Sequence, residues 1–214
     1  MMKLFHKKEV WRPTVPGHIS IWILFGLLIL GLFFGLYPFL AKNRPLPQAE
    51  LVLVEGWLAD AEINEILKRI GPDQMVVTSG GPIVFCQKIL NYNTYAELGA
   101  ARLIDAGIEP ERILTVSAPP TDHDRTYVSA LAVRKRLQQE GLFGKPAELY
   151  TVGAHARRSH LLFRRAFGRD YPLGVTSIAP ASYHLDRWYL HSEGVRHVIG
   201  ELLAWIYAKF FMPS

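Results

Sequence analysis

The chain has 214 residues, half of them hydrophobic, which is enough for one folded domain with a sizeable core and an appendage. Its formal net charge of +5 would suit a nucleic-acid-binding protein, but six of the 24 basic residues and only one of the 19 acidic residues lie in residues 1–44. The rest of the chain is formally neutral, with 18 residues of each sign, which removes the charge argument for nucleic acid as a partner.

An uncharged stretch at residues 19–41 predicts a membrane-spanning helix, because a bilayer requires roughly 20 apolar residues. Trp22 and Tyr37 lie towards its two ends, as aromatic residues at membrane interfaces do. A cleaved signal peptide is the alternative, but its apolar core would be shorter and a cleavage site flanked by small residues would follow it. We therefore interpret 19–41 as an uncleaved membrane anchor.

Basic residues flank the span on both sides, four before it in the tail 1–18 and two shortly after it. The positive-inside rule then gives a modest preference for a cytoplasmic N-terminus and an extracytoplasmic main domain. We expect a single-pass protein of the inner (plasma) membrane. Residues 42–50 contain two prolines and are expected to form a short, stiff linker that holds the domain 51–214 close to the bilayer.

Short apolar runs alternate with longer amphipathic ones in the main domain. Strands are expected at 51–54, 74–78, 112–117, 147–152 and 174–178. Helices are expected at 60–70, 94–107, 126–140, directly after Gly153, and at 192–211. Asp60 is expected to cap the first of these helices, and Thr94 with Glu97 has the form of a capping box. The pattern predicts a Rossmann-like α/β domain, with a parallel sheet covered on both faces and right-handed crossovers. The last helix is expected to cover the sheet, although its aromatic end, 205–211, could instead rest on the bilayer.

Polar residues follow all five predicted strands. In order along the chain they are Glu55; Ser79, Gly80 and Gly81; Asp122, Asp124, Arg125 and Thr126; His155, Arg157 and Arg158; and Tyr183 and Arg187. Ligands of open parallel sheets bind outside the carboxyl ends of the strands, so five polar strand ends at one edge predict a binding site.

Arg157 and Arg158 are the most informative of these residues, because they fall in the first turn of a predicted helix. The partial positive charge of a helix N-terminus disfavours cations there, so two arginines require a reason. An anion is one, since free backbone N–H groups and the arginine forks would both bind it. The sequence therefore predicts recognition of a small phosphate- or carboxylate-bearing ligand.

Three side chains are candidates for catalysis, each with a structural alternative. Glu55 could act as a general base, or could neutralise Arg157 or Arg158, since buried arginines need a partner. His155, beside two arginines, should resist protonation and would suit a neutral base, or could merely cap the helix. Glu97 is a further carboxylate, with its capping-box role as the alternative.

The sequence gives weaker signals for a phosphate-binding loop, a metal site or a reactive cysteine. Gly80-Gly81 could be a tight turn or a phosphate cradle, and neither a complete GxGxxG nor a Walker motif is present. Asp122-His123-Asp124 lacks metal-ligand spacing, so no metal site and no particular cofactor is predicted. Cys86 is the only cysteine, which excludes an intrachain disulfide and is most simply read as a small apolar residue.

Several of these short motifs, in this order, resemble the YdcF/SanA/ElyC-like family of bacterial domains of unknown function. The pieces are Val77-Thr-Ser-Gly-Gly81, Glu97 in Thr-Tyr-Ala-Glu, Asp124-Arg-Thr126, Val152-Gly-Ala-His-Ala-Arg-Arg158 and Ser192-Glu-Gly-Val-Arg196 with the helix that follows. Two loops, Glu55-Gly-Trp57 and Arg125-Thr126, depart from the common family form. The resemblance implies a Rossmann-like fold, frequent membrane anchoring, and a link to envelope integrity and lipid-carrier-dependent wall synthesis.

Three functional hypotheses remain open from the sequence. The first is an envelope protein that binds a small anion, such as an isoprenoid-phosphate or sugar carrier, near the bilayer. The second is a non-catalytic scaffold in which the arginines only pair with Glu55, Asp124 and Glu193. The third, suggested by one branch of the resembling family, is an enzyme that uses a nucleotide or S-adenosylmethionine.

Overall fold

The chain divides into two units, Met1–Leu36 and Tyr37–Ser214. The computed structural model describes residues 12–84 and 91–212, so Cys86 lies outside the described residues. Most of the first unit is α1 (Val15–Leu40), which begins four residues before the predicted span and has Pro16 in its first turn, where a missing N–H is tolerated. Among the described residues, α1 is the one helix long and apolar enough to cross a membrane, and a signal sequence would meet the same criteria.

The second unit is an α/β domain built on five parallel strands, as predicted. The strands are β1 (Leu51–Glu55), β2 (Met75–Gly80), β3 (Ile113–Ser117), β4 (Ala147–Val152) and β5 (Leu173–Ile178). Their order in the sheet is β3-β2-β1-β4-β5. The chain adds β2 and β3 on one side of β1 and then β4 and β5 on the other, so the switch point of the sheet lies between β1 and β4.

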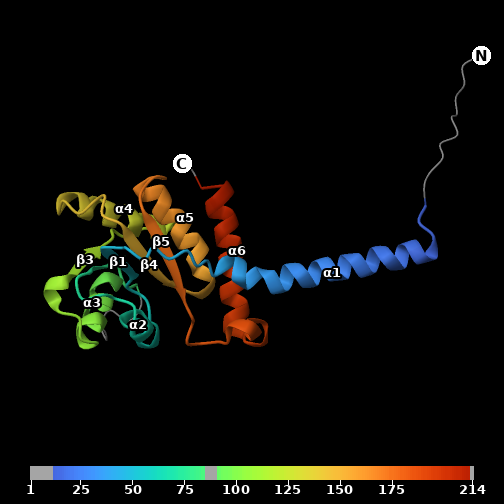
Figure 1. The fold of residues 1–214 in the computed structure, drawn as a ribbon, viewed down its shortest axis with the longest axis horizontal. Helices are drawn as coiled ribbons and strands as arrows, with labels where there is room; N and C mark the ends of the chain where they lie inside the picture. Colours follow the sequence, from blue (N-terminus) through green and yellow to red (C-terminus); the bar gives the residue numbers. More distant parts are fainter. Residues whose placement is uncertain (1–11, 85–90, 213–214) are drawn as a thin grey trace, which may run out of the picture. The chain divides into compact units, whose positions relative to one another are not determined.

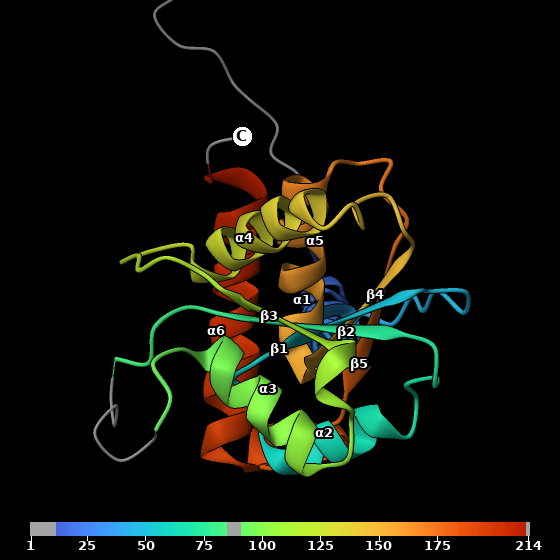
Figure 2. The ribbon, with the colours of Figure 1, turned by 90° about the vertical axis from the view of Figure 1, so that its left-hand side faces the viewer.

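Helices cover both faces of this sheet (Figure 1; Figure 2). They are α2 (Asp60–Leu67), α3 (Tyr95–Asp105), α4 (Arg125–Gln139), α5 (Ala156–Phe167) and α6 (Ser192–Phe210). Successive strand residues point to opposite faces, so β1 contributes to two cores. Leu51 and Leu53 pack with α4 and α5, whereas Val52 and Val54 pack with α2 and α3.

The helix starts test two predictions about caps. The capping box of α3 is confirmed, because Thr94 Oγ1 accepts from the Glu97 amide at 3.2 Å while Glu97 Oε2 accepts from the Thr94 amide at 3.3 Å. The prediction that Asp60 caps α2 is wrong. Ala59 precedes that helix, and its amide is satisfied by Glu62 Oε2 at 3.0 Å.

The segment between α1 and β1 packs along the domain. Arg44 pairs with Val175 through two backbone hydrogen bonds, of 2.8 and 3.0 Å, and the Leu46 amide donates to the buried Glu148 carboxylate at 2.8 Å. The segment therefore covers the outer edge of β5, where an uncovered strand would expose unpaired backbone groups. Tyr37 and Leu40, at the end of α1, are buried in the same domain.

Close approach of α3 to the sheet depends on Gly56. A Cβ atom at Gly56 would lie 2.0 Å from the Tyr95 carbonyl oxygen, and one at Gly99 would lie 2.6 Å from Gly56 Cα. Backbone atoms cannot move aside as a flexible side chain can. We expect Gly56→Ala to lower the free energy of unfolding by about 1–3 kcal/mol, the usual range for overpacking.

Urea unfolding of the full chain in detergent measures this effect. Gly71→Ala is the matched control, because a Cβ there meets only the Gln74 side chain, at 3.5 Å, an ordinary van der Waals distance. Equal unfolding midpoints for the two variants would show that α3 does not need to approach Gly56 so closely.

Candidate functional site

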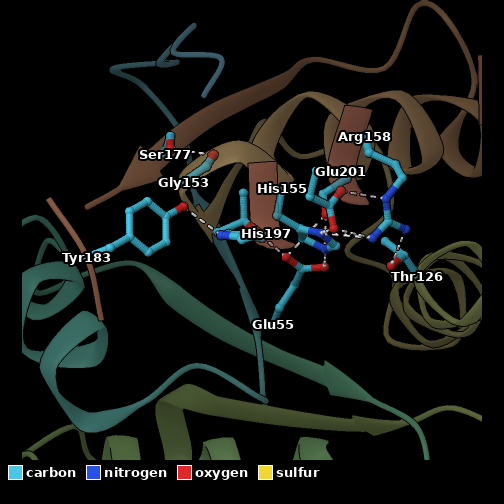
Figure 3. A network of polar contacts seen from close by, with 11 residues as sticks. Glu55, Thr126, Gly153, His155, Arg158, Ser177, Tyr183, His197 and Glu201 are labelled. Carbon is cyan, nitrogen blue, oxygen red and sulfur yellow. Dashed lines mark hydrogen bonds and ion pairs between the residues drawn. The ribbon is translucent and has the colours of Figure 1, made fainter. Parts of the chain in front are cut away.

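Four charged side chains from four different segments meet at the carboxyl edge of the sheet, beside the switch point (Figure 3). Glu55 ends β1, and His155 ends a 3-10 turn, Gly153–His155, directly after β4. Arg158 comes from the first turn of α5 and Glu201 from α6. We call these four residues the buried ion network.

His155 lies between the two carboxylates of the network. Its Nε2 atom is 3.3 Å from Glu55 Oε1 and its Nδ1 atom is 2.8 Å from Glu201 Oε1. Both ring nitrogens must donate to bind two carboxylates, which requires the imidazolium form. Burial alone would lower the pKa of His155, but the charges of Glu55 and Glu201 and the hydrogen bonds to them outweigh burial and raise the pKa to about 9.

The prediction that His155 resists protonation is therefore wrong. It considered only the neighbouring arginines, whereas the fold adds two carboxylates. Arg158 Nη2 does approach His155 Nδ1 to 2.9 Å, and both groups are donors. Both groups donate to the same acceptor, Glu201 Oε1, which lies 2.9 Å from Arg158 Nη2. Because they share this negatively charged acceptor, their close approach is compatible with an imidazolium.

Glu55 is enclosed by hydrogen-bond donors. Its carboxylate accepts from the hydroxyl of Thr151, from Ser159 Oγ at 3.0 Å, and from His155. Burial tends to raise the pKa of Glu55, but the charge of His155 and these hydrogen bonds outweigh it and lower the pKa, so Glu55 is ionised. The prediction that Glu55 neutralises Arg157 or Arg158 is wrong, because its ion-pair partner is His155.

Arg157 and Arg158 point to different places. Arg158 binds Glu201 with a two-pronged contact, Nε to Oε2 at 2.8 Å and Nη2 to Oε1 at 2.9 Å, and reaches Thr126 Oγ1 at 3.4 Å. The guanidinium of Arg157 lies over the Phe39 ring, 3.8 Å from its centre, and its Nε donates to the Phe39 carbonyl. Neighbouring residues of a helix project about 100° apart. Arg157 and Arg158 therefore belong to different groups of side chains although they are adjacent in sequence.

A cleft of about 460 Å³ opens at the same edge of the sheet. It is lined by Trp57, Ala59, Glu62, Val152, Pro180, Ser182, Glu193, Arg196, His197, Gly200 and Glu201. Trp57 stands edge-on to His155, with ring centres 5.2 Å apart, and Glu201 of the network lines the cleft directly. Burial lowers the pKa of His197, whose Nδ1 is hydrogen-bonded to the Tyr183 hydroxyl at 2.7 Å. Acidic residues outnumber basic ones in this lining, so the cleft does not favour an anion.

A group of cations with no acidic partner lies instead next to the end of α1. It consists of Lys42, Arg44, Arg157 and Arg164, which we call the basic cluster. Burial and then the positive charges of the three arginines lower the pKa of Lys42, so each arginine acts electrostatically on this lysine. Within residues 12–84 and 91–212, none of the four has a carboxylate oxygen within 4.0 Å of its side-chain nitrogens.

His160 is the hydrogen-bond partner of Lys42 in the basic cluster. Its Nδ1 atom lies 2.9 Å from Lys42 Nζ, and its Nε2 atom lies 3.3 Å from the Leu173 carbonyl. Burial and the neighbouring positive charge of Lys42 lower the pKa of His160 to about 4, so the ring is neutral near pH 7. The Nε2–H group then donates to Leu173 while Nδ1 accepts from the Lys42 ammonium, which fixes the position of the cation without neutralising it.

The remaining predicted site residues are placed elsewhere. Ser79 and Gly80 end β2, and Gly80 is in close contact with Tyr95, because a Cβ there would lie 2.6 Å from Tyr95 Cβ. The Gly81 carbonyl accepts from the Tyr95 amide at 2.9 Å. Gly80 therefore allows α3 to pack, and Glu97 serves its capping box.

The loop before α4 contributes less than its residue types suggested. Asp124 occupies the position before α4 with φ 53, in the left-handed region, and its carboxylate makes no capping hydrogen bond to the described part of that helix. Its negative charge nevertheless helps to raise the pKa of Arg158. Arg125 is exposed, whereas Thr126 joins Arg158.

The sequence interpretation missed the residues that complete both groups. Glu201 carries the only acidic charge between Arg196 and Lys209 of a largely apolar helix, a signal that could have identified it. Lys42 was assigned to a linker, and Ser159 and Thr151 have no distinguishing pattern. Within the described parts of the chain, no three His, Cys, Asp or Glu side chains come together in a way that could hold a metal ion.

Comparison with known proteins finds no matching family model, no matching curated protein and no matching solved structure. The resemblance to the YdcF/SanA/ElyC-like family therefore stays a prediction from the sequence.

Proposed function

We propose that this chain is a membrane-anchored protein of the cell envelope, and that its α/β domain binds a small phosphate- or carboxylate-bearing ligand at the bilayer surface. The observation that supports this most directly is the basic cluster. Lys42 follows the last residue of α1 by two positions, and three arginines of the cluster act on it, with no carboxylate paired to any of the four among the described residues. Cations that act on a common position and are not neutralised are favourable for a ligand with more than one negative charge.

The composition of the cluster also suits such a ligand. Three of its members are arginines, whose planar forks match the oxygens of phosphate and carboxylate groups, and the fourth is a lysine that acts as a point charge. A head group beside the end of a membrane helix would belong to a lipid, for example an isoprenoid-phosphate or a lipid-linked sugar carrier. The resemblance to the YdcF-like family agrees with a role in envelope or wall biogenesis.

The location we propose is the inner (plasma) membrane, with α1 as a single retained span and the main domain outside the cytoplasm. The support is the length of α1 and the larger number of basic residues before it than after it. A compartment-specific reporter fused after Ser214 distinguishes this orientation from a cytoplasmic domain.

Arg158 has a supporting part in this proposal. Its charge is neutralised by Glu201 in the buried ion network, so it positions α5 and leaves Arg157 as the member of the pair that meets the ligand. The same pairing favours the alternative of a non-catalytic scaffold at the carboxyl edge, because it accounts for Arg158 without any ligand there.

Removing two charges from the basic cluster should weaken anion binding. In the full chain in detergent, we expect Lys42→Gln with Arg157→Gln to raise the dissociation constant for inorganic pyrophosphate about tenfold or more. The reason is that a hydrogen bond to a charged group contributes about 1.5–3 kcal/mol, and about 1.4 kcal/mol corresponds to a factor of ten. Isothermal titration calorimetry measures the constant.

The matched control is Arg69→Gln with Lys135→Gln, which changes the net charge equally at two exposed positions outside the cluster. We expect this control to bind pyrophosphate within about twofold of the unaltered chain, since screened charges at a distance contribute little. Equal weakening in both double variants would mean that only net charge matters, and would remove the basic cluster as a site.

A further inference from the structure

The outer face of α6 carries a row of exposed apolar residues along the helix, and the exposed Arg196 lies among them. Its members recur every three or four residues, which places them on one side of a helix. They are Val195, Ile199, Leu203, Tyr207 and Phe210. Leu203 is 61% exposed and Phe210 is 68% exposed, so these are open surface positions. We call these five residues the α6 outer face.

The inner face of the same helix is already occupied. Val198 and Ala208 are buried, Glu201 belongs to the buried ion network, and Trp205 packs edge-on against Phe39 with ring centres 5.1 Å apart. At 3.6 residues per turn, these positions lie on the opposite side of α6 from the outer face. The core of the domain therefore does not account for the outer apolar residues.

Two contacts place the inner face of α6 and the basic cluster beside the last turn of α1. Phe39, in the last turn of α1, is the residue on which Trp205 packs, so the point where α1 joins the domain lies against α6. Arg157 of the basic cluster covers the same Phe39 ring. Apolar, aromatic and basic groups thus adjoin one another at the end of the helix that would cross the bilayer.

This composition is typical of a helix that lies in a membrane interface. Such helices have leucine and aromatic residues on one face, and tyrosine and tryptophan near the head groups. Phe211, which is 71% exposed, and Lys209 extend the pattern at the C-terminal end of α6. A water-facing helix would have charged residues at most of the outer positions, where they would favour solubility.

We propose that α6 is an interfacial membrane helix, with its outer face toward the acyl chains and the basic cluster at the level of the anionic head groups. This inference rests on the proposed membrane anchor. It adds a second attachment, so that the domain lies on the bilayer in a fixed orientation and its basic cluster faces lipid.

Spin labels report which environment the outer face meets. Cys86→Ser removes the only native cysteine, and Leu203→Cys or Phe210→Cys then places a single nitroxide on the outer face. The full chain is reconstituted in vesicles of phosphatidylcholine and phosphatidylglycerol. Collision with oxygen, which concentrates in lipid, is compared with collision with a water-soluble nickel chelate. We expect the ratio of oxygen to nickel collisions to be several-fold higher at positions 203 and 210 than at Lys135→Cys, an exposed control on α4.

A label at Leu28→Cys, in the middle of α1, separates failure of this inference from failure of the proposed anchor. Lipid-like collision at 28 together with water-like collision at 203 and 210 overturns the inference alone. Water-like collision at 28 overturns the anchor and the inference with it. Strong dipolar broadening between labels at 203 would show that a second copy covers the face, and would also overturn the inference. Each labelled protein must keep the urea midpoint of the unlabelled chain, which is expected because both side chains are exposed.

Discussion

Replacing Glu55 by alanine is expected to lower the free energy of unfolding by about 3–5 kcal/mol, because removal of one partner of a buried ion pair leaves the other charge uncompensated. Glu55 is only 4% exposed and is the acceptor for His155, Thr151 and Ser159. Its loss would leave three buried donors without this acceptor. Urea unfolding of the full chain in detergent measures the change.

Two further variants separate charge from volume. Glu55→Gln keeps the size of the side chain but not its charge, so we expect a smaller loss than for alanine. Glu65→Ala removes an exposed carboxylate that pairs with Lys68 on the same helix, and should change stability much less. If Glu55→Ala were no more destabilising than Glu65→Ala, the buried ion network would not hold the domain together.

The second large effect concerns the alkaline side of the pH-stability curve. The pKa of His155 is raised from 6.5 to about 9 in the folded chain, so its imidazolium stabilises the fold fully below about pH 6.5. That contribution is lost as the pH rises from about 6.5 through 9. A difference of this size corresponds to roughly 3 kcal/mol. Glu55 and Glu201 have lowered pKa values, so their contribution is lost only on the acid side, as the pH falls below about 4.5.

This expectation is tested by measuring the free energy of unfolding of the unaltered chain and of His155→Gln from about pH 5 to about pH 10. This range covers both the charged and the neutral form of His155. Glutamine cannot titrate, so the difference between the two curves should be largest near the low end and shrink as the pH approaches the pKa of His155. A difference that stays constant across the range would mean that folding does not shift the pKa of His155, and would contradict the expectation.

The two experiments examine one structural role. The buried ion network joins the end of β1, the turn after β4, the start of α5 and the middle of α6 through charges that neutralise one another. Because α6 also carries the apolar outer face, the network fixes the helix that we propose to lie on the bilayer. The carboxyl edge of the sheet thereby holds α6 in place as well as forming a cleft.

Much of the fold followed from local pattern. All five strands were predicted to within two residues at each end, because buried parallel strands are continuous apolar runs such as Leu51-Val-Leu-Val54. Caps were less predictable. The capping box of Thr94 and Glu97 has a residue pattern that is visible in the sequence. At the start of α2, in contrast, the capping position fell on Ala59 because the Glu62 carboxylate accepts a hydrogen bond from the Ala59 amide.

The sequence predicted part of the buried ion network at the carboxyl edge of the sheet, but not its contacts and not the basic cluster. Polar strand ends placed Glu55 and His155 at one edge, and the fold brings them together. It does not bring Ser79, Gly81 or Glu97 into the buried ion network, since α3 packs against that end of β2. The protonation state of His155 was predicted wrongly because it is set by Glu55 and Glu201, residues 100 and 46 positions away.

The sequence by itself determined the apolar N-terminal span, the alternation of strands and helices, and the excess of positive charge around the span, because these depend on which residues are neighbours along the chain. Only the tertiary structure decided the partners of the charged groups. Arg157 and Arg158 are adjacent in sequence, yet one joins Lys42 and Phe39 while the other joins Glu201. The physical reason is that a helix turns successive side chains in different directions, and the energy of a buried charge depends on what distant segments bring within a few ångströms of it.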